Sequence, residues 1–418
     1  MNVLYITAAC LTKNTSANMS HNAFVKGLLD NGYNVDVIMS KNSWGEEDKA
    51  LPKLDNVRYF EYDAETLAEK LRKKGGKLTA AAVMTQSETD RTECCKINAS
   101  TGILSMLARR IRNLLKKVFY SLVHQDSLYP LENAMFTNVL KFNSDCDYHL
   151  IISNSSPAAS HKVAEILIKK KRVKSKRWVQ IWEDPWYYDL YGGRSSAIKE
   201  EEHRLLNVAS EVYYVSPLTM MYQMQYFPDC SEKMKIVPLP FFQYSVDGEA
   251  DCLGEMVLGY FGDYFSCTRN LRPFYEALCK VGCLGYIYGD SDENLQSTDK
   301  VTVSGRVTLD ILDGVQRRTN VLVHLCNLKG GQIPGKIYHY SATRKKILFI
   351  LDGDEKEKDM LLRFFSRFNR YYFCNNDVDE IVNTIERMKS DTSISNDVIR
   401  DFEPKNVVEK IINKESFV

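Results

Sequence analysis

The chain has 418 residues, 44% of them hydrophobic and 26% charged, and is long enough for two globular domains. The charges of its 55 basic and 54 acidic side chains nearly cancel. The net charge therefore gives no support for binding to nucleic acid or other polyanions. No apolar run approaches the roughly 18 residues that a membrane-spanning helix needs.

The first half of the chain alternates apolar runs with amphipathic stretches. Asn2–Ala8 is an apolar run that predicts a buried strand rather than a signal peptide. A helical stripe follows at Ala23–Leu29, and Gly32 ends that helix before the apolar run Val35–Met39. This order predicts a βαβ unit in a parallel sheet. Further strands are expected at His149–Ser153, Trp178–Trp182 and Val212–Val215, with a helix at Ile198–Val208.

The alternation restarts after Lys235–Phe242, where two prolines impose an extended backbone. The sequence therefore predicts an α/β protein in which two Rossmann-like, doubly wound domains face an interdomain cleft. We expect domains at 1–238 and 239–395, and a helical tail at 396–418 that packs back on the first domain. The expected elements of the second domain are strands at Met256–Phe261, Leu284–Tyr288, Val301–Ser304, Val321–Leu325 and Ile347–Leu351, and helices at Arg272–Val281 and from Pro334.

The eleven cysteines are scattered, without the spacing of a metal site or a disulfide framework. This pattern favours reduced thiols and a cytoplasmic location.

The segment His324–Leu351 carries the clearest chemical signal. Its apolar strand ends in a glycine-bearing polar loop, Pro334 stands where a helix would begin, and Gly335 and Lys336 follow. Free backbone N–H groups in a first helical turn, the helix dipole and a lysine charge together form an anion site that suits a diphosphate. The alternative is a plain Gly-Pro loop before a helix.

Within this segment, GQIPGKIYHYSATRKKILFIL resembles the donor-site segment of GT-B-fold glycosyltransferases, especially the retaining family 4 group. Shorter matches follow the order of that family: MNVLYIT, NGYNVDVI, EEEHRLLNVASEVYYVS, KIVPLPF and LGYFGDYFSCTRNL. The resemblance implies that 1–238 binds the acceptor and that 239–395 binds the nucleotide-sugar donor. It further implies a hexosyltransferase-like enzyme that transfers a sugar from a UDP- or GDP-sugar to a saccharide or lipid-linked saccharide. Retention of configuration and a role in bacterial surface-polysaccharide biosynthesis are also what it implies.

The resemblance also implies which residues form the donor site. Lys336 matches the lysine of the Pro-Gly-Lys motif and is a catalytic candidate that neutralises the leaving diphosphate. The sequence departs from the family where His339 and Gly331 replace acidic residues, and where Asp263 follows Gly262 in place of a basic residue. The donor-binding candidates are Gly262, Arg269, Arg272, Gly331, Ile333, Pro334, Gly335, Lys336, His339 and Tyr340, with Arg269 or Arg272 supplying the missing basic charge.

In the first half, QIWEDPWYYD (Gln180–Asp189) places two carboxylates and several aromatic rings at the end of a predicted strand. Carboxylates accept hydrogen bonds from sugar hydroxyls, and rings stack on sugar C–H faces. A carboxylate at a strand end is also a candidate acid–base group. We take Asp184 as the first catalytic candidate and Glu183 as the second. The alternative is an aromatic corner with solvated acids.

The stretch Ile103–Val123 has an apolar helical stripe opposite a basic face. It predicts either peripheral contact with the inner face of the cell membrane or a surface helix packed on its own core. The acceptor-binding candidates are Asp126, Trp186, Tyr187 and Ser16.

The seven histidines show no metal-ligand spacing, so the scheme includes neither a metal nor another cofactor. Two other functions remain open on the sequence. The lost acidic pair suits a catalytically degenerate GT-B-fold binding or scaffold protein, and the same fold suits a nucleotide-sugar 2-epimerase.

Overall fold

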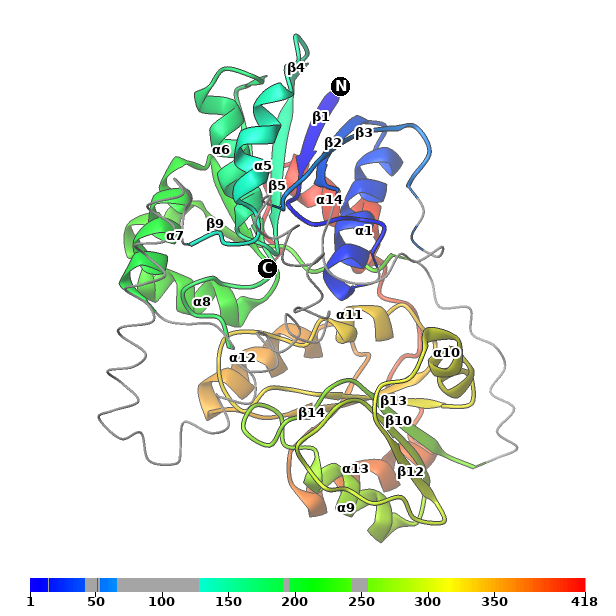
Figure 1. Cartoon of the computed structure of the whole chain (residues 1–418). Coiled ribbons are helices and arrows are strands. Elements are labelled where there is room, and N and C mark those ends of the chain that lie inside the picture. The colour runs from blue at the N-terminus through cyan, green and yellow to red at the C-terminus, as the bar shows by residue number, and fades with distance from the viewer. Residues whose placement is uncertain are drawn as a thin grey trace, which may run out of the picture. The chain divides into compact units, whose positions relative to one another are not determined.

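The computed structural model describes residues 1–13, 15–41, 51, 53–65, 128–190, 195–242 and 255–417. The chain divides into two compact units, whose elements are labelled in Figure 1. The first unit comprises Met1–Val215, Gln223–Val237 and Val408–Val418, and the second comprises Ser216–Tyr222 and Pro238–Val407.

The first unit contains a parallel sheet with the strand order β3-β2-β1-β5-β7-β8-β9 among the described residues. Its first strand is continuously apolar and buried from Val3 to Ile6, as expected when helices cover both faces of a sheet. The order reverses direction between β1 and β5, so ligands are expected at the carboxyl ends of these strands. The strands are β1 (Asn2–Ile6), β2 (Asn34–Ser40), β3 (Val57–Tyr62), β5 (Leu150–Ser155), β7 (Trp178–Trp182), β8 (Glu211–Tyr214) and β9 (Met234–Ile236), and a separate short pair is β4 (Asp147–Tyr148) with β6 (Lys174–Ser175).

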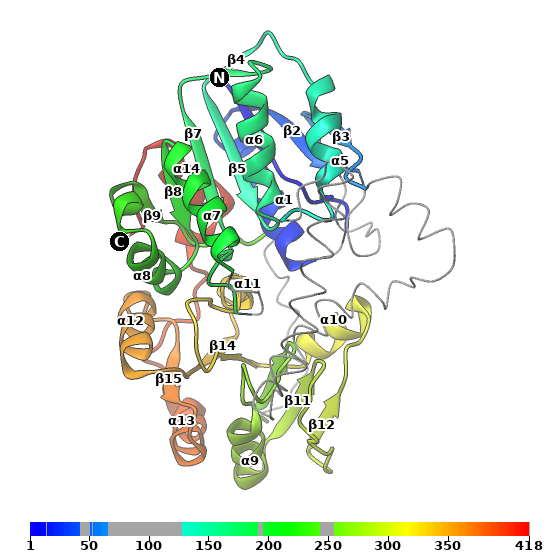
Figure 2. The ribbon, with the colours of Figure 1, turned by 60° about the vertical axis from the view of Figure 1, so that its left-hand side comes forward.

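Helices of the first unit pack on this sheet through apolar faces. In α6, Val163, Ala164 and Leu167 are fully buried in a core cluster that includes Leu4 and Ile6 of β1. Figure 2 shows α6 lying along β5, with which it is in contact. The helices are α1 (Ser16–Asp30), α5 (Asn133–Asn138), α6 (Ala159–Lys169), α7 (Ser196–Val208), α8 (Pro217–Tyr226) and α14 (Pro404–Ile412), of which α8 and α14 contribute residues to both units.

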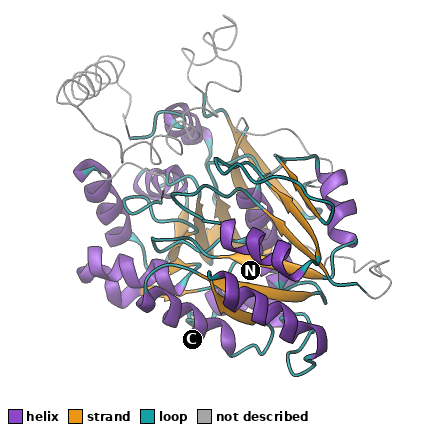
Figure 3. Ribbon diagram, turned by 90° about the horizontal axis from the view of Figure 1, so that it is seen from below, coloured by secondary structure: helices purple, strands orange, loops and turns teal. Residues whose placement is uncertain are grey.

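The second unit contains a parallel sheet with the order β12-β11-β10-β13-β14-β15 among the described residues. Here the order reverses between β10 and β13. Helices α9 and α13 lie side by side (Figure 1), and Figure 3 shows helices flanking the strands. The elements are β10 (Val257–Phe261), α9 (Arg272–Val281), β11 (Leu284–Tyr288), β12 (Val301–Ser304), α10 (Leu309–Arg317), β13 (Val321–Leu325), α11 (Lys336–Tyr340), β14 (Lys346–Leu351), α12 (Glu355–Ser366), β15 (Tyr372–Asn375) and α13 (Val378–Ser390).

The structure confirms the predicted α/β class with two Rossmann-like sheets, and the bounds of β7, α9, β11, β12 and β13 are those expected. The other elements differ from the expected bounds, most of them by one or two residues. The helix expected from Pro334 begins at Lys336 and ends at Tyr340, because Pro334 and Gly335 form the turn that precedes it. A helix of this length has few aligned peptide groups, so its dipole contributes less to anion binding than a long helix would.

The end of the chain lies in the first unit. The Arg177 guanidinium donates to the carbonyl oxygens of Ile411 and Ile412, the latter at 2.9 Å, and the backbone N–H of Phe417 donates to Ile236 at 2.8 Å. These contacts connect the final segment to β9 and to the residue that precedes β7.

Two expectations concern residues outside the described ranges, namely the amphipathic segment Ile103–Val123 and Asp126. None of the described helices combines the length and the apolar character needed to cross a bilayer. Seven cysteines in the described ranges carry free thiols, whereas Cys267 is disulfide-bonded. The expectation of reduced thiols throughout is therefore wrong at Cys267, because spacing along the sequence does not report proximity in space.

Candidate functional site

Three basic side chains gather at the carboxyl edge of the second sheet, beside the strands between which the strand order reverses. We call Lys336, Arg269 and Arg306 the cationic cluster. The ammonium group of Lys336 donates to the carbonyl oxygen of Phe261, the last residue of β10. Arg269 donates to the carbonyl oxygen of Asp263 at 2.8 Å, and Arg306 donates to the Asp263 carboxylate, with one contact at 3.0 Å. The loop after β10 thus collects all three cations.

Hydrogen bonds connect this loop to the loop that follows β13. The Arg269 guanidinium donates to Oδ1 of Asn327 at 2.8 and 3.1 Å, and the Asn327 amide donates to the carbonyl oxygen of Gln332 at 2.9 Å. Asn327 is buried, so its position is well determined by these partners. The two strand ends on either side of the reversal point therefore share one polar network, in the place where such sheets bind nucleotides.

The surroundings of Lys336 disfavour its charged form. The pKa of Lys336 is lowered to about 8, chiefly by burial; the Asp263 charge opposes this shift, and the charges of Arg269 and Arg306 add to it. The Asp290 carboxylate lies beside the cationic cluster, 3.1 Å from Nε of Arg306. Three cations with two carboxylates leave an excess of positive charge that an anionic ligand would offset.

The structure places the other predicted donor residues around this cluster, with different roles. A methyl group on Gly262 would lie 3.7 Å from the Tyr260 hydroxyl and 3.8 Å from the Lys336 ammonium, so this glycine borders the cationic cluster. The hydroxyl of Tyr340 donates to the Phe261 carbonyl at 3.5 Å. Burial, followed by the Lys336 charge, lowers the pKa of His339 to about 4, which keeps this ring neutral at physiological pH. Arg272 faces Glu293 at 3.7 Å, and it is Arg269 that contacts the loop after β13.

Gly331 has a packing role. Its carbonyl oxygen accepts from Oγ1 of Thr219 at 2.6 Å and from the Ser216 hydroxyl at 3.3 Å. A Cβ at this position would lie only 2.9 Å from the Tyr222 ring, so only glycine fits without movement. Ile333 and Pro334 line a small recess beside it, together with Asn327, Asp352 and Glu357. Gly335 is the residue before α11.

In the first unit, the strand ends carry a chain of buried polar groups. Asn154 of β5 donates to Oε1 of Glu183 at 3.2 Å and to the Tyr5 hydroxyl at 2.8 Å, and Nδ1 of His21 lies 2.7 Å from that hydroxyl. All four side chains are buried. Burial, followed by the charge of Asp184, raises the pKa of Glu183 well above its ordinary value, so the neutral carboxyl is favoured. Asp184, the next residue, is partly exposed.

The aromatic loop, Asp184–Asp189, is anchored by a side chain of α7. The fully buried Glu202 carboxylate accepts the backbone N–H of Tyr187 at 2.6 Å and that of Trp186 at 3.4 Å. Burial raises the pKa of Glu202 to about 7. The Trp186 ring packs against Tyr129 at 5.1 Å between centroids, whereas Tyr187 stacks edge-on with Tyr226 at 5.4 Å.

We expect Glu202→Ala to lower the free energy of unfolding by about 3 kcal/mol, because two backbone N–H groups lose a buried acceptor. Urea unfolding at neutral pH measures the change. Glu200→Ala is the matched control, since Glu200 is exposed on the same helix and should change stability by less than about 0.5 kcal/mol. Equal effects of the two substitutions would contradict an anchoring role for Glu202.

Solved structures similar to this chain now identify its fold. A glycosyltransferase from Rickettsia africae ESF-5 has a TM-score of 0.54 and 10% identity, over 99% of this chain and 97% of that one. An E. coli structure described as trehalose-6-phosphate bound with UDP-2-fluoro glucose has a TM-score of 0.54 and 10% identity, over 98% and 96% of the two chains. The chain has the GT-B fold.

A UDP-GlcNAc 2-epimerase from Methanocaldococcus jannaschii is also similar, with a TM-score of 0.50 and 8% identity over 99% of this chain and 100% of that one. No protein-family model matches the chain, and no curated protein matches it. The GT-B fold is therefore shared with enzymes of two kinds, and the choice between them depends on the residues of this chain.

Within this GT-B fold, sequence reasoning missed Arg306 of the cationic cluster, and it missed Asn154, Tyr5 and His21 beside Glu183. Arg306 follows β12, far along the sequence from Lys336, and only a basic residue directly after a predicted strand would have pointed to it. Asn154 and His21 are isolated polar residues in apolar surroundings, and nothing in their spacing joins them to Glu183. Of the acceptor candidates, Ser16 is exposed at the first position of α1, whose cap is supplied by Thr15.

Proposed function

We propose that the chain is a glycosyltransferase whose second unit binds a nucleotide sugar through its diphosphate. The observation that carries this proposal is the cationic cluster at the carboxyl edge of β10 and β13. A diphosphate there would accept hydrogen bonds from Lys336, Arg269 and Arg306 and would offset their charge. The R. africae glycosyltransferase and the E. coli structure with UDP-2-fluoro glucose support a nucleotide-sugar donor, and we propose a UDP- or GDP-sugar.

In the proposed reaction, the bond between the anomeric carbon and the diphosphate oxygen breaks, and a bond to an acceptor hydroxyl oxygen forms. Negative charge develops on the leaving diphosphate, where the cationic cluster stabilises it. We propose that Asp184 acts on the acceptor hydroxyl as the acid–base group and that Tyr187 contacts the acceptor saccharide. Glu183 is then a buried neighbour that orients this strand end.

The finer assignments rest on the resemblance of the donor segment to family 4. They comprise hexosyl transfer with retention, a saccharide or lipid-linked acceptor, a role in surface-polysaccharide biosynthesis, and a cytoplasmic or peripheral inner-membrane location. They form part of the proposal, and the donor assignment does not depend on them.

Isothermal titration with matched ligands tests the donor site. We expect UDP or GDP to bind at least about 30-fold more tightly than uridine or guanosine, which corresponds to about 2 kcal/mol from the diphosphate. Arg306→Ala should remove most of this difference while leaving nucleoside binding unchanged. Equal affinities for nucleoside and nucleoside diphosphate would overturn the assignment.

Product analysis separates the proposed transferase from its rivals. A transferase releases nucleoside diphosphate only with an acceptor and forms a new glycoside. An epimerase, the other activity found among similar structures, converts the donor without any acceptor. Tight donor binding with neither product across a panel of acceptors would identify a binding or scaffold protein.

The charge of Lys336 predicts how donor binding depends on pH. The pKa of Lys336 in the ligand-free protein is about 8, so the ammonium group is present below this pH and is lost above it. We expect the Kd for UDP or GDP to rise about fivefold between about pH 7 and about pH 8.7. Lys336→Arg, which stays charged over this range, should remove the dependence. A wild-type affinity that is constant across the range would contradict the role of Lys336.

A further inference from the structure

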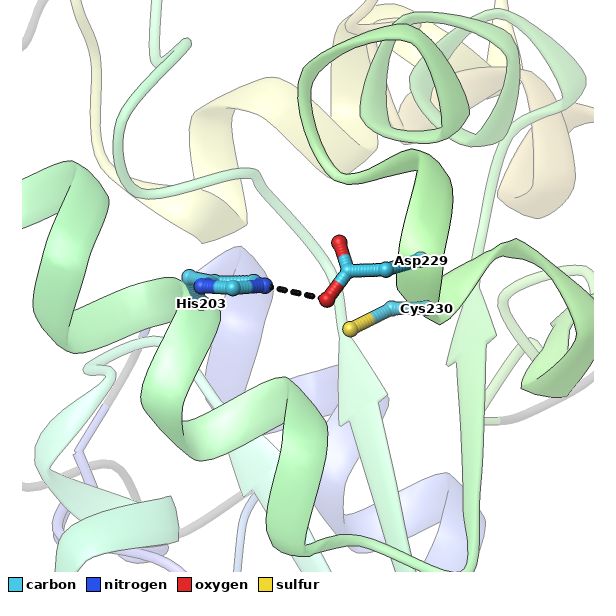
Figure 4. Close-up of side chains that lie close together, drawn as sticks. All are labelled: His203, Asp229 and Cys230. Atoms are coloured by element: carbon cyan, nitrogen blue, oxygen red, sulfur yellow. Dashed lines mark hydrogen bonds and ion pairs between the residues drawn. The ribbon is translucent and has the colours of Figure 1, made fainter.

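A second cluster of polar side chains lies at the end of α7, in the first unit. His203 and Asn207 come from α7, and Asp229 and Cys230 come from the short 3-10 helix Pro228–Lys233. Figure 4 shows the His203 ring and the Asp229 carboxylate pointing toward each other, with the Cys230 sulfur beside them. The ligand atoms of His203, Asp229 and Cys230 all lie within 4.8 Å of one another.

Hydrogen bonds connect the side chains of this cluster to one another. Nε2 of His203 lies 2.7 Å from the Asp229 carboxylate and 3.0 Å from the amide nitrogen of Asn207. A single ring nitrogen cannot donate to the carboxylate and accept from the amide at once. Rotating the Asn207 amide would turn its oxygen toward Asp229, to which its nitrogen is also hydrogen-bonded. The Asn207 amide also donates to the backbone carbonyl of His203 at 3.2 Å, so Nε2 is left to donate its proton to the carboxylate.

A cation would take the place of the proton between Nε2 of His203 and the Asp229 carboxylate. Nε2 of His203 and the Asp229 carboxylate would both direct lone pairs at the ion, and the Asn207 amide would keep its bond to the carboxylate. The Cys230 sulfur, 3.5 Å from Oδ1 of Asn207, supplies a third ligand after its thiol proton passes to solvent. An imidazole, a carboxylate and a thiolate are the donor set that zinc prefers.

The surroundings suit an ion that enters from solvent. The side chains of His203 and Asp229 are 40% and 57% exposed, which leaves a route to the site. The His203 ring stacks on Phe227 with a centroid distance of 5.7 Å and an interplanar angle of 10°, so its direction is held. Cys230 is buried and faces the cluster from beneath.

We propose that His203, Asp229 and Cys230 bind a zinc-type divalent cation, with water in the fourth position. The site joins α7 to the segment before β9 and is separate from the cationic cluster. It also lies one residue from Glu202, which anchors the aromatic loop, so the ion stabilises the helix that positions this loop. The inference does not depend on the proposed glycosyltransferase activity.

Cobalt titration of the full chain, reduced and freed of metal, tests the site. We expect about one Co²⁺ per chain, with the near-ultraviolet absorption of a thiolate–cobalt bond, and displacement of the cobalt by zinc. His203→Gln and Asp229→Asn should weaken binding at least about tenfold, and both alter exposed side chains that the fold tolerates. Cys230→Ser should abolish the thiolate band, and Cys279→Ser, at an exposed free thiol, should leave it unchanged.

Two results would overturn the site. One is the absence of cobalt or zinc binding at about 100 µM metal. Protein zinc sites have dissociation constants far below this concentration and would be occupied. The other is a thiolate band that persists in His203→Gln and Cys230→Ser, because the ion would then be held by other cysteines. Circular dichroism of each variant confirms that it is folded before the titrations are compared.

Discussion

Replacement of Lys336 by alanine is expected to lower donor turnover by about 10²- to 10³-fold, or roughly 3–4 kcal/mol of transition-state stabilisation. The ammonium group lies at the end of β10 among Arg269, Arg306 and Asp263, where charge would develop on the departing diphosphate. Release of UDP or GDP from the nucleotide sugar measures the effect. The loss should appear in both kcat and KM, because the Lys336 charge also contributes to donor binding.

Lys356→Ala is the matched control for this substitution. Lys356 is exposed on α12 of the same unit, so the charge change is the same and turnover should stay within about twofold. Lys336→Arg should recover part of the activity, since it retains the charge with a different geometry. If Lys336→Ala is folded and turns over donor at the wild-type rate, the donor site lies elsewhere.

Asp184→Asn is expected to lower kcat/KM by about 10²- to 10⁴-fold, while Glu183→Gln stays within about threefold of the wild type. Asp184 is partly exposed at the end of β7 and is proposed to act on the acceptor hydroxyl. Glu183 is buried, its raised pKa favours the neutral carboxyl, and it accepts from Asn154, which glutamine also does. The two neighbouring carboxyl groups are thus expected to respond differently to replacement by an amide.

Transfer of labelled sugar to a saccharide acceptor, with both variants assayed side by side, shows which of the two carboxyl groups is the acid–base group. Asp189→Asn makes the same substitution in the same loop and should leave kcat/KM within about threefold of the wild type. A large loss in Glu183→Gln with a small loss in Asp184→Asn would reverse the assignment. Large losses in both variants would indicate that the two carboxyls work as one unit.

Much of the fold follows from local patterns along the chain. Strands such as Trp178–Trp182 and Val321–Leu325 are short apolar runs between polar turns, and buried parallel strands are recognisable from that pattern alone. Gly32, with φ of +78°, ends α1 as its position suggests. The helix expected from Pro334 illustrates the limit, because propensity does not determine where a short turn becomes regular helix.

The candidate sites divide in the same way. Lys336 and the pair Glu183–Asp184 follow predicted strands, and their positions at the carboxyl edges of the sheets were expected from the sequence. The anchoring of the aromatic loop by Glu202 was not, since Glu202 lies on the next helix, 15 residues beyond Tyr187. The sequence also did not predict the cluster of His203, Asp229 and Cys230, because His203 lies 26 residues before Asp229 and the three have no metal-site spacing.

By itself, the sequence determined the alternation of strands and helices, the two α/β halves and the presence of a lysine after a glycine-bearing loop, because these depend on hydrophobic period and turn chemistry. Only the tertiary structure decided which further cation lies near Lys336. Arg306 follows a strand that is distant in the sequence, and it reaches the Asp263 carboxylate through the fold. The tertiary structure also decided which carboxylate is buried and neutral. Both outcomes depend on strand order and solvent exposure, which arise from packing between segments far apart in the chain.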